Sequence, residues 1–194
     1  MSNETLIQTS PRRLFIGNAS KVVLSASAVA LLGGKDVLAA GKPADVKSDI
    51  AILNVAVGLE YEGIAAYAIA LQSGLLSPSH VKAAMKFQDD HKAHNDALIG
   101  TIKKLGGKAV EGKTIAEYAK ALEVDKLKTE DDVLSLAARL ELGATNAYLS
   151  VIPALKDPQL AKIAGRLAAE EATHFALLNF DLKRPFAPTM SFGA

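Results

Sequence analysis

The stretch that decides the fold lies near the end of the chain, where residues 169–174 read Ala-Glu-Glu-Ala-Thr-His. On a helix, Glu171 and His174 are one turn apart and share a face with the apolar residues Leu167 and Leu178. A carboxylate buried in an apolar core is very unfavourable unless it is paired or coordinates a metal. The stretch therefore predicts a helix that turns two metal-ligating side chains toward the core.

The same feature recurs, working outward, on three other predicted helices. Glu60 and Glu141 each lie on a face that is otherwise mostly apolar, and His91 and His94 are one turn apart on another such face. Two of the four helices thus carry a single Glu and the other two carry a pair of ligand residues one turn apart. A di-metal site in a bundle core needs this arrangement. The predicted metal ligands are Glu60, His91, His94, Glu141, Glu171 and His174.

Each of these residues has a plainer alternative. An inward Glu can pair with a cation, an inward His can be a hydrogen-bonded core residue, and only the joint pattern favours metal. Tyr67 and Tyr148 follow Glu60 and Glu141 by two helical turns, and core packing is favoured for them over a role as radical relay or hydrogen-bond partner of a ligand. Three further acidic residues are expected to contact the ligands at most, and not to bind metal themselves: Glu62, Asp90 and Glu170. Glu170 is expected to face a neighbouring helix or solvent.

Apolar spacing and end signals predict four long helices. Ser77-Pro78, Thr129 and Asp157-Pro158 are typical of helix N-termini. Gly74 and Gly106-Gly107 are typical of helix ends, and Pro153 ends or kinks its helix. The predicted helices are 47–73, 78–105, 129–153 and 158–182.

The segments between these helices define the topology. Residues 41–49 are polar and contain a proline, which indicates a linker, and the tail from residue 183 is predicted to be irregular. Residues 108–128 form a long crossover with a short helix at 114–122. The fold class is therefore all-α: an antiparallel four-helix bundle with one long crossover containing a short helix.

Composition excludes several classes of protein and site. The chain has 194 residues, a formal net charge of +1 and no cysteine. The near-neutral charge argues against a nucleic-acid partner, which needs a basic surface. Without cysteine there is neither a disulfide nor a thiolate metal site, so a metal must be held by histidines and carboxylates.

The N-terminus resembles an export signal. Residues 10–16 read Ser-Pro-Arg-Arg-Leu-Phe-Ile, as in twin-arginine signals, and an apolar run at 22–32 and small residues at 37–40 follow. Such a run is too short to span a membrane. We expect a twin-arginine signal peptide at 1–40, cleaved after Ala39 or Ala40, and the bundle with its tail at 41–194. The protein is then periplasmic or otherwise exported, without a stable membrane span; an uncleaved anchor or a helix of the fold is the alternative.

Three stretches together resemble the ferritin-like superfamily, and in particular its exported bacterial ferritin-like domain proteins, which are related to desiccation-associated proteins. They are residues 53–62, 141–149 and 169–174. The resemblance implies a ferritin-like bundle that holds two iron or manganese ions. It also implies the roles of five residues: terminal carboxylates Glu60 and Glu141, bridging carboxylate Glu171, and nitrogen ligands His94 and His174.

One position departs from the pattern of that family. The family pattern places Glu-x-x-His on the helix 78–105 as well, but here His91 stands in the place of the bridging Glu. Asp90 lies about 100° around the helix and does not take its place. The ligand balance shifts toward nitrogen, which suits zinc or copper better than before, and a single-metal site stays open.

Two function classes follow. The first is an exported metalloprotein that binds one or two ions, iron or manganese before zinc, with oxidase or peroxide-scavenging activity. The second is a non-catalytic bundle with a role in envelope stress or desiccation and a polar or single-zinc core. The expected partners are metal ions and the twin-arginine export machinery, and a homo-oligomer is compatible with the sequence. No motif indicates a substrate.

Overall fold

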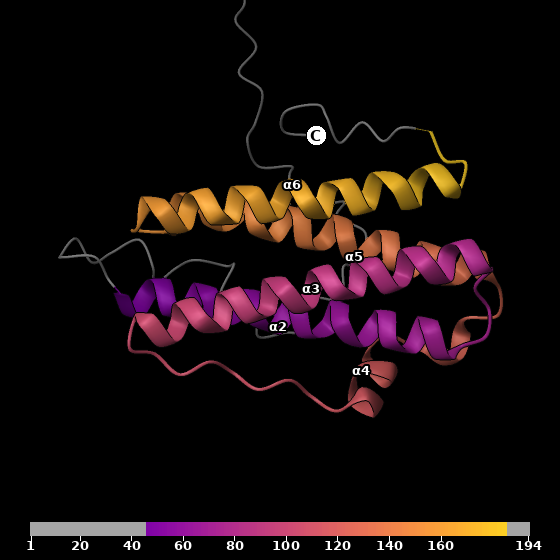
Figure 1. Cartoon of the computed structure of the whole chain (residues 1–194), viewed down its shortest axis with the longest axis horizontal. Coiled ribbons are helices and arrows are strands. Elements are labelled where there is room, and N and C mark those ends of the chain that lie inside the picture. Colours follow the sequence, from indigo (N-terminus) through magenta and orange to yellow (C-terminus); the bar gives the residue numbers. More distant parts are fainter. Residues whose placement is uncertain (1–45, 186–194) are drawn as a thin grey trace, which may run out of the picture.

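A computed structural model describes residues 46–185, which fold into an all-α bundle without a strand. Four long helices lie side by side and a short one sits in the crossover (Figure 1). The predicted fold class is confirmed. The helices are α2 (Val46–Gln72), α3 (Pro78–Lys104), α4 (Ile115–Ala121), α5 (Glu130–Val151) and α6 (Pro158–Asp181), with 3-10 turns at Val124–Lys126 and Ile152–Ala154. The predicted signal segment 1–40 lies outside the described residues.

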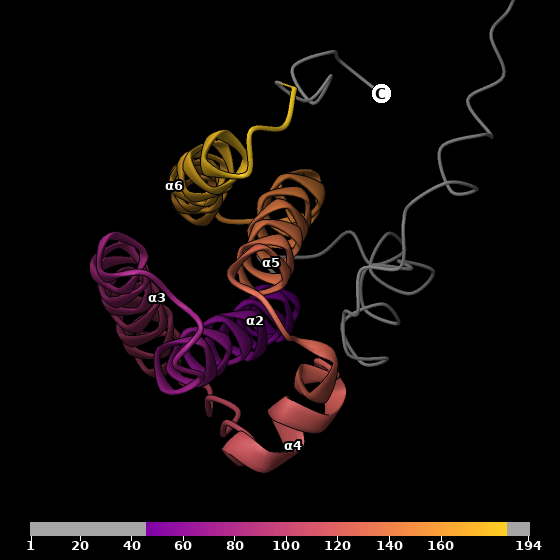
Figure 2. The same cartoon turned by 90° about the vertical axis from the view of Figure 1, so that its right-hand side faces the viewer.

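The four long helices pack as two hairpins, α2 with α3 and α5 with α6 (Figure 2). Glu130, the first residue of α5, accepts the backbone N–H of Ser77 at 2.6 Å, just before α3. Both helices therefore begin at the same end of the bundle, and the crossover runs its full length. As a result α5 is antiparallel to α2, and α4 packs against α2 outside the bundle.

The helix ends follow the predicted signals, with one exception. Thr129 accepts the N–H of Asp132 in a capping box, and Asp157 accepts the N–H of Gln159. Ser77 stands at the N-cap of α3 but makes no capping bond, because its Oγ lies 3.0 Å from His80 Nδ1 instead.

Asp49 does not belong to a linker. The structure places it in the first turn of α2, only 2% exposed, where it accepts the backbone N–H groups of Lys156 (2.9 Å) and Asp157 (3.1 Å). Its carboxylate thus ties the start of α2 to the start of α6.

The apolar core has two parts with a polar layer between them. One part contains Leu53 and Val57 of α2, and the other contains Tyr67, which comes two turns later on the same helix. Glu60 lies between them on α2, and each of the other long helices shows the same order.

By length and composition α2 also resembles a membrane-spanning helix, with a mean hydropathy of 1.3 over its best window. Core helices share these properties, and Glu60 is buried in the middle of α2.

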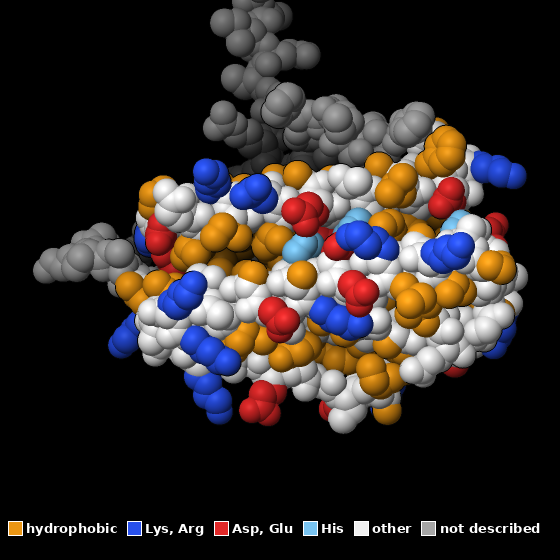
Figure 3. Space-filling model, in the orientation of Figure 1, with side chains coloured by type: hydrophobic (Ala, Val, Ile, Leu, Met, Phe, Trp, Pro, Cys, Tyr) orange, Lys and Arg blue, Asp and Glu red, His pale blue; other side chains and the backbone are white. Residues whose placement is uncertain are grey.

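The surface carries charges of both signs. On the face in Figure 3, basic and acidic side chains are interspersed, and histidine side chains show in the seam between α3 and α6. No continuous basic patch is visible on this face, in agreement with the near-neutral net charge.

Candidate metal centre

The polar layer brings together all six residues that the sequence singles out. They form two overlapping groups of four, and within each group one ligand atom per residue lies within 4.8 Å of the others. All six side chains are buried, and the three carboxylates are at most 1% exposed. His91 and Glu171 belong to both groups. The convergence agrees with the predicted site, while metal ligation itself stays a prediction. The groups are Glu60, His91, His94 and Glu171, and His91, Glu141, Glu171 and His174.

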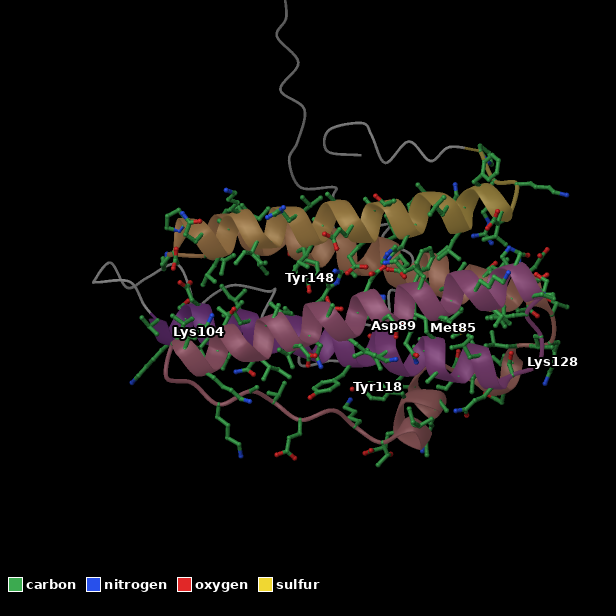
Figure 4. The ribbon with its side chains drawn as sticks, viewed as in Figure 1. Met85, Asp89, Lys104, Tyr118, Lys128 and Tyr148 are labelled. Atoms are coloured by element: carbon green, nitrogen blue, oxygen red, sulfur yellow. The ribbon has the colours of Figure 1, made fainter. Side chains whose placement is uncertain are left out.

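In the first group, every facing atom has a hydrogen-bond partner. His91 Nδ1 lies 2.8 Å from Glu60 Oε2, and His94 Nδ1 lies 3.1 Å from Glu171 Oε1. The second carboxylate oxygen of Glu60 accepts the hydroxyl of Tyr148. Figure 4 shows Tyr148 inside the bundle, where α5 places its hydroxyl against Glu60 of α2.

The second group is more open. His174 Nδ1 lies 3.3 Å from Glu171 Oε2 and 3.6 Å from Glu141 Oε2. Among the described residues, none of these three atoms has a hydrogen-bond partner, although all are buried. His91 Nε2 is 3.4 Å from Glu141 Oε1, which also accepts the hydroxyl of Tyr67.

The two tyrosines do more than fill the core. Both are buried, and each donates to the carboxylate on the other helix: Tyr67 of α2 to Glu141 of α5, and Tyr148 of α5 to Glu60 of α2. The geometry supports two of the sequence-based interpretations: core packing, because both rings lie in the apolar clusters, and the role of hydrogen-bond partner to a candidate ligand. The spacing of seven residues is the signal, because it returns a residue to the same helical face.

Two carboxylates outside the group of six contact the ring nitrogens of His94 and His174 that point away from the centre of the layer. Glu170 Oε2 lies 2.7 Å from His94 Nε2, and Asp90 Oδ2 lies 3.3 Å from His174 Nε2. Glu170 reaches the neighbouring helix and is also 58% exposed, as predicted. Metal-ligating histidines commonly donate their second N–H to such a carboxylate, which fixes the tautomer and the ring orientation. Lys86 in turn pairs with Asp90.

Electrostatics of the layer follow from burial and close pairing. Burial raises the pKa of Glu171, and contacts with histidines offset this only in part. In Glu60 the effect of burial is outweighed by His91 and His94, so that its pKa is lowered. Burial opposes the charged form of His174, but the neighbouring carboxylates raise its pKa to about 9. A cation that binds here must displace protons from the histidines.

Packing fixes the rings of His91 and His174. A Cβ atom on Gly63 would lie 3.0 Å from three atoms of the His91 ring, so α2 needs a glycine at the point where the ring passes. The ring of Phe87 stacks on His174 with centroids 4.1 Å apart. By helical spacing, Gly63 shares the face of Glu60 and Phe87 shares that of His91 and His94, but only the packing reveals that both position candidate ligands.

A pocket between α2 and α5 reaches the layer. It encloses roughly 660 Å³, solvent included, and its walls are mainly apolar. Its polar lining residues are Glu62, Tyr67, His91 and Glu141. Glu62 is a wall of this pocket rather than a neighbour of the buried histidines, and burial raises its pKa to about 7 despite Lys113 and Arg139.

A family model described as the ferritin-like domain matches residues 48–183. The chain belongs to the ferritin-like domain family. One similar solved structure of this fold is a conserved hypothetical protein of Mycobacterium tuberculosis, with a TM-score of 0.60 and 20% identity over 75% of this chain and 97% of that one. This likeness concerns the fold alone. No curated protein matches the sequence significantly.

The donor set of this ferritin-like chain fits a metal ion. Three carboxylates and three imidazoles converge, and three of their buried atoms are unpaired within residues 46–185. His174 Nδ1 lies at ion-pair distance from the two carboxylate oxygens, but none of the three atoms makes a hydrogen bond with a described residue. Buried polar atoms without a hydrogen bond are rare. A divalent cation accepts all three at once, and oxygen and imidazole nitrogen are ligands that iron, manganese and zinc take.

Proposed function

We propose that the protein is an exported metalloprotein that holds one or two divalent cations in the polar layer of its bundle. The observation that carries the proposal is a set of three buried atoms that lie close together and have no hydrogen-bond partner among the described residues: Glu141 Oε2, Glu171 Oε2 and His174 Nδ1. Three carboxylates favour iron or manganese, and zinc is the alternative. A bound iron or manganese ion would supply one-electron chemistry toward oxygen or peroxide.

The chain's own residues prepare the centre for such a cation. Tyr67 and Tyr148 hold the carboxylates of Glu141 and Glu60 in place, and an apolar cluster lies on either side of the layer. The pocket between α2 and α5 gives a small oxidant a route to His91 and Glu141. These features support an oxidase or peroxide-scavenging activity.

Metal analysis of protein purified from the periplasm tests the proposal. We expect bound metal in the wild type and its loss in Glu171→Gln, while Asp89→Asn retains it because Asp89 is an exposed partner of Lys92. Binding to the folded state also raises the melting temperature, so a chelator should lower it in the wild type and in Asp89→Asn but not in Glu171→Gln. Metal-free protein with the same melting temperature in chelator and in added metal would refute the proposal.

A second function is favoured by a separate observation. Histidine–carboxylate pairs such as His91–Glu60 and His94–Glu170 satisfy much of the layer without a cation. A non-catalytic bundle for envelope stress or desiccation needs nothing more. It predicts that metal and chelator leave the melting temperature of the wild type unchanged, and not only that of Glu171→Gln.

The export part of the proposal rests on residues 10–16. Replacement of Arg12 and Arg13 by lysine should retain the protein in the cytoplasm, because the pair is the address that the export machinery reads. Lys21→Arg is the matched control and should be exported. Periplasmic and cytoplasmic fractions, compared by immunoblotting, give the answer, and export of the double-lysine variant would contradict it.

A further inference from the structure

The two halves of the polar layer are not equivalent. All the unpaired atoms of the layer's six residues lie in the group of His91, Glu141, Glu171 and His174. In the other group, the inward nitrogens of His91 and His94 already hydrogen-bond to carboxylates. A cation can therefore bind between His91, Glu141, Glu171 and His174 without breaking the hydrogen bond between His91 Nδ1 and Glu60.

Distances distinguish the halves in the same way. Four ligands at 2.0–2.2 Å from a tetrahedral cation are about 3.3–3.6 Å apart. Two contacts in the open half match this edge: 3.6 Å from His174 Nδ1 to Glu141 Oε2 and 3.3 Å from His174 Nδ1 to Glu171 Oε2. His91 Nε2 lies 3.4 Å from the other carboxylate oxygen of Glu141, Oε1. In the other half the contacts of 2.8 and 3.1 Å are hydrogen bonds.

Contacts of one ring nitrogen of His91 and of His174 with carboxylates orient the other ring nitrogen toward the half that contains Glu141. A carboxylate only accepts, so the contact with Glu60 places a proton on His91 Nδ1, and a neutral ring then offers its Nε2 lone pair toward Glu141. The contact of His174 Nε2 with Asp90 leaves Nδ1 as the inward donor atom in the same way. His94 is held more closely on both sides, at 3.1 Å from Nδ1 to Glu171 Oε1 and 2.7 Å from Nε2 to Glu170 Oε2, whereas His91 Nε2 lies 3.4 Å from Glu141 Oε1.

Access adds a further argument. The pocket between α2 and α5 is lined by His91 and Glu141, whereas Glu60 and His94 are not among its lining residues. The half that contains the atoms without hydrogen-bond partners is therefore also the half that the pocket reaches.

From these observations we infer that the centre binds one cation tightly, through His91 Nε2, Glu141, Glu171 and His174 Nδ1, and that Glu60 positions His91 instead of ligating. The inference rests on the proposed function and specifies its site. Two carboxylates neutralise a divalent cation, and two imidazoles complete a four-coordinate set of the kind that Zn²⁺ accepts. Glu60, held by Tyr148, acts as the carboxylate that orients a ligating histidine.

The matched pair of His94 and His174 tests this assignment. Metal-free full-length protein, matured by export, is titrated with Zn²⁺ in a calorimeter with a competing chelator. We expect one tight equivalent in the wild type, a loss of affinity of more than about 100-fold in His174→Gln, and a change of only a few-fold in His94→Gln. Glu60→Gln should retain one equivalent with affinity lowered about 10–100-fold, the range for carboxylates that orient a ligand.

A measurement on the wild type covers the case in which a variant does not fold. With Co²⁺ bound, NMR should show two strongly shifted exchangeable ring protons, those on His91 Nδ1 and His174 Nε2. Two tight equivalents, or three shifted ring protons, overturn the inference and leave the proposed function standing. Equal losses in His94→Gln and His174→Gln also overturn it. No binding of Zn²⁺, Mn²⁺ or Fe²⁺ to the wild type overturns the proposed function itself.

Discussion

Replacement of Gly63 by alanine tests how closely α2 and the His91 ring fit together. The added Cβ would lie 3.0 Å from three ring atoms of His91, and this ring is held by Glu60 on one side and Glu141 on the other. Gly58 on the same helix is the matched control, because a Cβ atom there meets nothing within 4 Å. Both substitutions change the same backbone in the same way, so their difference isolates the contact with the ring.

The magnitudes follow from two opposed effects. Alanine in place of a mid-helix glycine stabilises by roughly 0.5–1 kcal/mol, and this is the full effect expected for Gly58→Ala. Overpacking of a rigid site costs about 1–3 kcal/mol, so Gly63→Ala should be less stable than Gly58→Ala by that amount.

Urea unfolding of the metal-free protein, followed by far-UV circular dichroism, measures both values. In a His91→Ala background, Gly63→Ala should stabilise as Gly58→Ala does, because the ring that it meets is gone. If Gly63→Ala stabilises the wild-type background as much as Gly58→Ala, the close fit of the ring against α2 is wrong.

Two further predictions concern the ends of the bundle. Asp49→Ala should lower the free energy of unfolding by about 1–3 kcal/mol, because the backbone N–H groups of Lys156 and Asp157 lose their buried acceptor; Asp49→Asn keeps one oxygen and should lose less in the same urea titration. Hydrogen bonds from Ser77 and His80 lower the pKa of Glu130 to about 2, and contact with Glu130 raises that of His80. The pair therefore stabilises fully between the unfolded values of 4.5 and 6.5, less as pH falls toward 2, and less as pH rises through the folded pKa of His80. Thermal melts of wild type and Glu130→Gln should differ most in that window, and a difference that is constant from pH 3 to 9 would contradict this assignment.

Local signals were sufficient for the helices and for the inward faces. Thr129 and Asp157-Pro158 mark helix starts because capping involves residues only a few positions apart, and Glu171 with His174 marks a face for the same reason. Such interactions join residues that are only a few positions apart, so the sequence shows them directly. The fold class was therefore predictable, and so was the set of residues that meet in the polar layer.

The partners across the layer were not predictable in the same way. The contact of Tyr148 with Glu60 joins residues 88 positions apart, and that of Tyr67 with Glu141 joins residues 74 apart. These contacts depend on the axial and rotational register of α2 against α5, which no local pattern contains. Asp49 shows the same limit: its sequence context is polar, and only the position of the start of α6 makes it a buried acceptor.

The asymmetry of the centre follows from one substitution in an otherwise symmetric layout. Glu60 corresponds to Glu141, Tyr148 to Tyr67 and His94 to His174, so the two halves offer equivalent sets of ligands. The exception is the pair His91 and Glu171. A carboxylate has lone pairs for both sides, whereas a neutral imidazole has a single one, because its other nitrogen carries a proton. A histidine at this position must therefore serve one half only, and the short contact of its Nδ1 with Glu60 directs the remaining lone pair toward Glu141.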